Sequence, residues 1–159
     1  MQPYFRDAVR GDLAAIATIL REESPNDPDT ARATPGHYER VLDEIDRQDG
    51  SYLLVAEYAN RLGAVVYLVT YPIIHGGTGR QAEIAGVWVA DAFRHTGIDA
   101  MLVDHALARA DDLGCEHVQV MANGARSGRH SFWERAGFIH LAAGYVRSVV
   151  DHPRLRRIS

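Results

Sequence analysis

Four stretches of the chain place apolar residues three and four positions apart, which is the spacing of a helix with one buried face. The stretches are Leu13–Leu20, Tyr38–Ile45, Leu102–Leu113 and about Gly128–Ala136. Asp12 and Thr34 stand before the first two as candidate N-caps, and Gly114 stands where the third should end. The pattern therefore predicts four helices.

Seven further stretches are rich in β-branched and aromatic residues and have the length of strands. They are Tyr4–Val9, Tyr52–Tyr58, Leu62–Thr70, Glu83–Val89, His117–Met121, Phe138–Leu141 and Tyr145–Val150. Asn60 lies in the short link between the second and the third and favours a hairpin there. The order of elements predicts an α/β fold of the α+β type, with a mixed, mostly antiparallel sheet of about seven strands and helices on both faces. Two segments with several prolines or glycines, Ser24–Pro35 and Pro72–Arg80, are predicted to be irregular.

The length of 159 residues, 47% of them apolar, suits one globular domain, which we place at residues 1–150, with a loose basic tail at 151–159. A formal charge of −4 argues against nucleic acid and anionic membranes as partners. A single cysteine cannot form an intrachain disulfide. The first residues lack the apolar core of a signal peptide, and the longest apolar run, Ala64–Val69, is too short to span a bilayer. We therefore expect a cytoplasmic protein.

The residues that indicate chemistry lie where the strand ending at Val89 runs through a turn into the longest predicted helix. This turn contains Arg94 and Gly97. A helix N-terminus behind a glycine-containing turn presents free backbone N–H groups and the positive end of the helix dipole, so a phosphate is its natural ligand. Arg94 adds a permanently charged phosphate partner. The same residues also fit an ordinary strand-to-helix connection with a surface arginine.

Two motifs in this region resemble those of the GNAT superfamily, the acetyl-CoA-dependent N-acetyltransferases. Arg94-x-x-Gly97, between a strand and a long helix, resembles the start of the pyrophosphate motif R/Q-x-x-G-x-G/A. Downstream, Arg126-x-x-x-His130-x-Phe132-Trp133-Glu134-Arg135-Ala136-Gly137-Phe138 is similar to the stretch R-x-x-A-H-x-F-Y-E-R-x-G-F of many members. The order of elements is similar over nearly the whole chain.

The resemblance implies a GNAT-like acyl-CoA N-acyltransferase fold and acetyl-CoA as cosubstrate. The pantetheine arm would lie between the strands Glu83–Val89 and His117–Met121, and the pyrophosphate would lie on the amides of the turn. Trp133 is interpreted as a packing residue that can also line the acyl channel, and Asn123 as a pantetheine partner or a turn residue. The residues so assigned to acetyl-CoA are Val87, Trp88, Val89, Arg94, His95, Thr96, Gly97, Ile98, Asp99, Asn123 and Trp133. The histidines lack metal-ligand spacing, so no metal is expected.

Three positions depart from the family pattern. Asp99 replaces a glycine or alanine, and a carboxylate about 5 Å from a pyrophosphate costs about 1–3 kcal/mol of binding free energy. Trp133 replaces a tyrosine that protonates the departing thiolate, which an indole cannot do. Ala85 stands where members often have a glutamate. Glu83 lies two residues earlier and, by strand alternation, on the face of Ala85 and Val87, so we expect it to act as the catalytic base, directly or through a water.

Glu83 can equally be a charged strand end that faces solvent, and His75, in the glycine-rich loop, is a second candidate base. The sequence thus predicts an N-acetyltransferase that acts on a primary amine of a small molecule, a peptide or a protein. A homodimer is the candidate assembly. Two alternatives stay open. One is a degenerate GNAT domain that serves as an interaction module with weak or no acyl-CoA binding. The other is a binding domain that uses the same cleft for another small molecule.

Overall fold

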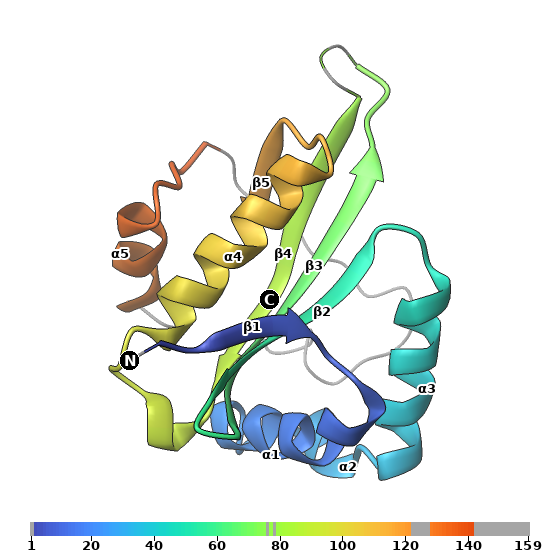
Figure 1. The fold of residues 1–159 in the computed structure, drawn as a ribbon, viewed down its shortest axis with the longest axis vertical. Coiled ribbons are helices and arrows are strands. Elements are labelled where there is room, and N and C mark those ends of the chain that lie inside the picture. Colours follow the sequence, from blue (N-terminus) through green and yellow to red (C-terminus); the bar gives the residue numbers. More distant parts are fainter. Residues whose placement is uncertain (1, 76, 78, 122–127, 142–159) are drawn as a thin grey trace, which may run out of the picture.

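The computed structural model describes residues 2–75, 77, 79–121 and 128–141 (Figure 1). The helices are α1 (Leu13–Glu23), α2 (Pro28–Arg32), α3 (Pro35–Arg47), α4 (Ile98–Asp112) and α5 (Gly128–Arg135). The strands are β1 (Tyr4–Asp7), β2 (Ser51–Tyr58), β3 (Arg61–Pro72), β4 (Arg80–Val89) and β5 (His117–Val120). Short 3-10 turns, Arg10–Asp12 and Asp91–Phe93, precede α1 and follow β4. Among these residues, no helix is both long enough and apolar enough to cross a membrane.

All four predicted helices are present, and α2 is an addition. Thr34 caps α3 as expected, because its hydroxyl accepts a hydrogen bond from the His37 N–H at 3.3 Å. The segment Ser24–Pro35 was expected to be irregular because it contains three prolines. Pro28 instead occupies the first turn of α2, where a missing N–H costs nothing, and the Asp27 carboxylate caps the helix at the Asp29 N–H.

The strands form one sheet in the order β1-β2-β3-β4-β5, with β5 parallel to β4 and the other pairs antiparallel. The expected hairpin joins β2 to β3 through Ala59 and Asn60, both at positive φ, as in a type I′ turn. The prediction of about seven strands is wrong for the described residues, in which the sheet has five.

The missing sixth strand is Phe138–Leu141, which lies after α5 without strand structure. Its residues have the composition of a strand, but no described strand pairs with them, and Ile139 and Leu141 are 74% and 83% exposed. A strand exists only through its ladder partner, and the composition of a segment does not supply one. The predicted seventh strand, Tyr145–Val150, and the predicted tail at 151–159 lie outside the described residues, and the limits of the domain stay a prediction.

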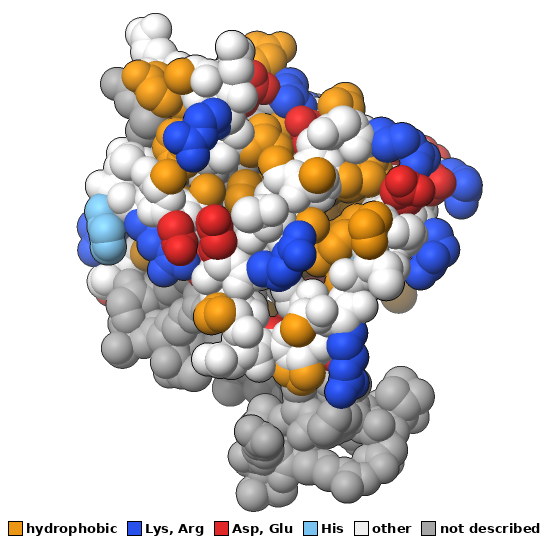
Figure 2. All heavy atoms as spheres, turned by 90° about the horizontal axis from the view of Figure 1, so that it is seen from below, with side chains coloured by type: hydrophobic (Ala, Val, Ile, Leu, Met, Phe, Trp, Pro, Cys, Tyr) orange, Lys and Arg blue, Asp and Glu red, His pale blue; other side chains and the backbone are white. Residues whose placement is uncertain are grey.

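Side chains from the two faces of the sheet enter two separate cores. On one face, β2, β3 and β4 pack against α4 and α5 through residues that include Leu54, Val66 and Ile84. On the other face, Val55 and Val65 pack against α1 and α3. The helices therefore cover both faces, as the sequence predicts (Figure 1). On the face seen from below, acidic and basic side chains are interspersed with hydrophobic ones (Figure 2).

A β-bulge in β4 changes which side chains share a face. Tyr67 on β3 pairs with Gly86 and Leu68 pairs with Ile84, so Ala85 has no partner on β3. One extra residue reverses the alternation along the strand. Ile84 and Val87 therefore both face α4, and Glu83 lies on the opposite face. The expectation that Glu83 and Val87 share a face is wrong, because simple alternation does not count the bulge.

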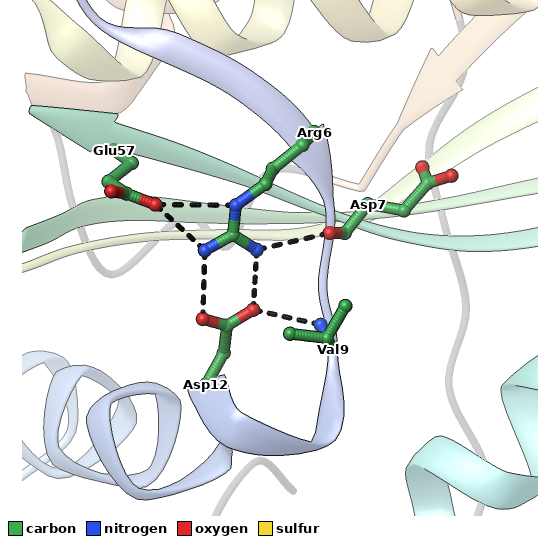
Figure 3. Close-up of polar contacts among 5 residues, drawn as sticks. All are labelled: Arg6, Asp7, Val9, Asp12 and Glu57. Atoms are coloured by element: carbon green, nitrogen blue, oxygen red, sulfur yellow. Dashed lines mark hydrogen bonds and ion pairs between the residues drawn. The ribbon is translucent and has the colours of Figure 1, made fainter. Parts of the chain in front are cut away.

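Arg6 links β1, β2 and the start of α1 (Figure 3). Its guanidinium donates to both carboxylate oxygens of Asp12, at 2.6 and 2.9 Å, and to Glu57 at 2.8 Å. Asp12 also accepts a hydrogen bond from the Val9 N–H at 2.8 Å. It is the N-cap residue of α1, as expected, but its side chain makes no capping hydrogen bond to that helix. The hydrogen bonds from Arg6 are the main reason why the pKa of the Asp12 carboxyl lies below its usual value, although burial opposes this shift. In turn, the carboxylates of Asp12 and Glu57 raise the pKa of the Arg6 guanidinium.

We expect acid to destabilise the fold through Asp12. Because the folded-state pKa of Asp12 is lowered, its stabilisation is complete above the pKa of the unfolded chain and is lost as the pH falls through the folded value. Asp12→Asn should lower the free energy of unfolding near neutral pH by about 1.5–3 kcal/mol and flatten its dependence on pH below about pH 4. Denaturant unfolding at several pH values measures both. Asp46→Asn, on the exposed surface of α3, is the control, and an equal loss in both variants would contradict this role.

Candidate active site

The parallel ladder between β4 and β5 is short. It pairs Gln81–Ile84 with His117–Val120, whereas β4 continues to Val89 with β3 as its strand partner. From Ala85 onward, no described strand lies against the β5-side edge of β4. The described ladder thus ends in the middle of β4, the strand beside which the resemblance places the pantetheine arm.

The end of β4 is in contact with two glutamates from the last turn of α1. The Val89 N–H donates to Glu23 Oε1 at 3.4 Å, and the Asp91 N–H donates to Glu22 Oε2 at 2.9 Å. Glu23 is 8% exposed, so its carboxylate is buried beside the end of β4. The Val89 amide, expected to hold pantetheine, therefore already has an acceptor. Sequence reasoning missed both glutamates. The sequence feature that could have revealed them is the presence of two acidic residues in the last turn of a predicted helix, where the helix dipole disfavours negative charge.

The turn before α4 has the backbone of an anion site. His95 and Gly97 both have positive φ, +64° and +81°, and Gly97 is the N-cap of α4. Within the described part of the chain, the amides of His95, Gly97, Ile98 and Asp99 have no hydrogen-bond acceptor. They lie at the positive end of a 15-residue helix. Thr96 differs from them, because its N–H and its hydroxyl both donate to the Phe93 carbonyl.

Arg94, predicted as the phosphate partner, is held at the rim of this turn. Its guanidinium forms an ion pair with Asp91 at 2.7 Å and donates to the Glu22 carbonyl at 3.3 Å. The side chain is about two-fifths exposed. Arg94 therefore links the turn to α1, and a bound anion would have to share it with Asp91.

Asp99 turns along the helix. Its Oδ1 accepts a hydrogen bond from the Ala100 N–H at 2.9 Å, so the carboxylate occupies an amide of the first turn. This contact stabilises the helix end by about 0.3–1 kcal/mol. It also places a negative charge among the amides that a phosphate would use.

The predicted aromatic and apolar site residues lie in three different places. Val87, Val89 and Ile98 have side chains buried in the core below α4, so they offer only their backbone. Trp133 is 6% exposed and packs edge to face against Phe132 and Phe138, as the packing interpretation expects. The indole of Trp88 lies on the opposite face, over Gly86, where a Cβ atom would collide with the ring. Trp88 therefore belongs to the α1 side of the sheet.

The candidate base Glu83 is half-buried on the α1 side of β4. Its Oε2 accepts a hydrogen bond from Gln119 Nε2 on β5, at 3.4 Å. His75, the second candidate, is exposed in the loop between β3 and β4. Asn123 lies outside the described residues. No group of three or more His, Cys, Asp or Glu that could hold a metal occurs in the described ranges.

Comparison with known proteins assigns the chain to a family. The model of the acetyltransferase (GNAT) family matches residues 13–138. The chain belongs to the GNAT family. No curated protein sequence matches it.

Solved structures share this GNAT fold. A transcriptional regulator from Bacillus halodurans C-125 is 26% identical, with a TM-score of 0.82 over 92% of this chain and 99% of that chain. A putative acetyltransferase from Agrobacterium tumefaciens is 25% identical, with a TM-score of 0.83 over 91% and 99% of the two chains. An aminoglycoside N-acetyltransferase solved in complex with CoA is 13% identical, with a TM-score of 0.75 over 94% and 96%. The last likeness concerns the fold alone.

We expect Asp99→Ala to improve CoA binding. The substitution removes a negative charge and frees the Ala100 amide, so the dissociation constant should fall by the equivalent of about 1–3 kcal/mol, and less at high salt. The same change should lower the free energy of unfolding by at most about 1 kcal/mol. Calorimetric titration with CoA at two ionic strengths measures the first effect. Asp112→Ala, at the other end of α4, is the control. Unchanged affinity would show that Asp99 does not face the ligand.

Proposed function

We propose that this protein is an N-acetyltransferase that transfers the acetyl group of acetyl-CoA to a primary amine of a small molecule, a peptide or a protein. One observation carries the proposal. The β4–β5 ladder ends at Ile84, and β4 then leads into a turn whose amides at the N-terminus of α4 have no acceptor among the described residues. A strand edge followed by an anion site fits an elongated ligand with a pyrophosphate at one end.

The residues between the end of the β4–β5 ladder and the N-terminus of α4 fit acetyl-CoA in part. The amides of His95 and Gly97–Asp99 would hold the pyrophosphate, with Arg94 at the rim. The β4 backbone beyond Ala85 would hold the pantetheine arm, once Glu23 releases the Val89 amide. When bound, acetyl-CoA supplies an activated acyl group as a thioester. The backbone N–H groups of β4 would orient that group and stabilise negative charge on its oxygen.

The acceptor needs a base, because an amine of pKa about 10.4 is neutral in only about one molecule in 2,500 at pH 7. Glu83 supports this role through its position on the face that α4 does not cover, close to the end of the ladder. Its carboxylate would accept the ammonium proton, directly or through a water. No acid is assigned to the departing thiolate, since Trp133 is buried and an indole has no usable acidity. A thiol of pKa about 8.5 leaves adequately as the anion.

The interaction-module alternative also has support from specific contacts. The carboxylates of Glu22, Glu23 and Asp99 each occupy an amide next to the proposed cosubstrate site. If these contacts persist in solution, CoA binds weakly or not at all. Calorimetry with CoA, followed by turnover of acetyl-CoA over a panel of amines, separates the two functions. The chain contains no lysine, so its own side chains contribute no background acetylation. The cytoplasmic location and the homodimer stay predictions.

We expect Arg94→Ala to weaken CoA binding by about 1–3 kcal/mol, because it removes charge-assisted hydrogen bonds to the pyrophosphate. Isothermal titration calorimetry measures the dissociation constant. Arg47→Ala, an exposed arginine near the end of α3, controls for the loss of one positive charge. Equal affinities of the two variants would place the pyrophosphate elsewhere.

We expect Glu83→Gln to lower the rate of acetyl transfer about 10²–10⁴-fold, since it removes the base that deprotonates the acceptor. The affinity for CoA should change little, because Glu83 lies away from the pyrophosphate turn. Single-turnover kinetics with an active amine measures the step. Glu44→Gln, on α3, is the control. A loss of less than about threefold in the chemical step would exclude Glu83 as the base.

A further inference from the structure

Four polar side chains form a cluster on the α1 side of β3, β4 and β5, next to the end of the β4–β5 ladder. They are Tyr71, Gln81, Glu83 and Gln119. The sheet register brings them together, because Gln81 pairs with Tyr71 and Glu83 pairs with Gln119. The proposed function uses only Glu83, so the other three have no assigned role.

The hydrogen bonds of the cluster fix what Tyr71 can do. Gln81 Nε2 donates to the Tyr71 hydroxyl oxygen at 3.2 Å and to Gln119 Oε1 at 2.7 Å. Gln119 Nε2 donates to the same hydroxyl oxygen at 2.8 Å and to Glu83 Oε2 at 3.4 Å. The Tyr71 oxygen thus accepts two hydrogen bonds, which leaves only its proton for a further partner. No acceptor for that proton lies among the described residues.

Two opposing influences act on the pKa of the Tyr71 hydroxyl. Burial, followed by the negative charge of Glu83, raises this pKa above its usual value, and the hydrogen bonds from Gln119 and Gln81, which lower it, are the weaker influence. At neutral pH the surface therefore presents one anionic group, Glu83, and one neutral donor, the Tyr71 O–H. Both groups contact the same nitrogen, Gln119 Nε2, so they lie close to each other.

An acceptor has to reach β4 from this side of the sheet. The α4 side is filled at this level by Ala82, Ile84, Val87 and Trp133, all buried in one core. On the α1 side, the stretch of β4 between Glu83 and Trp88 carries no large side chain. The residues that face this side there are Ala85, which is exposed, and Gly86. The Trp88 indole lies over Gly86 and bounds this stretch. The cluster thus adjoins the place where the reacting nitrogen would arrive.

We propose that this cluster recognises the acceptor, and that it selects a primary amine carrying a hydroxyl or carbonyl oxygen three bonds from the nitrogen. This inference rests on the proposed function. Glu83 receives the ammonium group and Tyr71 donates its proton to the oxygen. Gln81 and Gln119 hold the Tyr71 hydroxyl in the donor orientation. Tyr71 is accordingly a specificity-determining residue, and the acetyl transfer itself does not require it.

The test compares two amines of equal size, 2-aminoethanol and propylamine, which differ by a hydroxyl in place of a methyl group. The wild-type protein should acetylate 2-aminoethanol with the higher kcat/KM. Tyr71→Phe should lower kcat/KM for 2-aminoethanol about two- to tenfold, the effect of one neutral hydrogen bond, and leave propylamine unchanged. Its dissociation constant for CoA should equal that of the wild type, and its thermal unfolding should show only the modest loss expected when Gln81 and Gln119 lose the Tyr71 oxygen as acceptor. Tyr4→Phe, at an exposed site on β1, is the control.

The outcomes separate this inference from the proposed function. If the wild type acetylates neither amine and no other amine of a panel, the proposed function fails and the inference fails with it. If the wild type acetylates both amines but Tyr71→Phe changes both equally or neither, the protein is an acetyltransferase and the assignment of Tyr71 is wrong. A loss confined to the amine that carries oxygen supports the inference. Glycinamide against butylamine repeats the comparison with a carbonyl oxygen.

Discussion

The extra residue at Ala85 determines how the candidate site is arranged. Before the bulge, Ala82 and Ile84 fill the core below α4, and after it Val87 and Val89 do so. Gln81 and Glu83 thereby lie at one end of the α1 side of β4, while Gly86 and Trp88 occupy the other end. Without the bulge, either the valines or the polar side chains would have to leave their faces.

The bulge also lies where β5 ends its pairing with β4. The β4 backbone beyond Ile84 therefore has β3 on one side and no described strand on the other. The strand then leads to an α4 N-terminus at which the amides of His95, Gly97, Ile98 and Asp99 have no acceptor among the described residues. The same few residues thus separate a covered core face, a strand edge and a polar face. In the proposed acyl-transfer site, the core face closes one side, the strand edge binds the cosubstrate and the polar face receives the acceptor.

Negative charge is the main factor that opposes CoA binding at the proposed site. Glu22, Glu23 and Asp99 accept hydrogen bonds from amides in or next to the proposed cosubstrate site, and Asp91 forms an ion pair with Arg94. A cosubstrate would have to displace some of these carboxylates from their amides. This displacement would weaken cosubstrate binding more than it would slow the acyl transfer. The site is therefore consistent with an enzyme that binds its cosubstrate weakly, and CoA affinity is the quantity that separates an enzyme from an interaction module.

The sequence alone determined the parts that depend on neighbouring residues. The predicted helices, the β2–β3 hairpin and the strand–turn–helix containing Arg94 and Gly97 follow from periodicity, capping residues and glycine, and the structure contains them. Tertiary structure decided everything that depends on a partner distant in the sequence. The bulge at Ala85 appears only in the pairing with β3, the contact of Glu23 with Val89 joins residues 66 positions apart, and Phe138–Leu141 has no described strand beside it. Local patterns fix backbone conformation and apolar faces, whereas pairing between distant segments fixes which side chains meet.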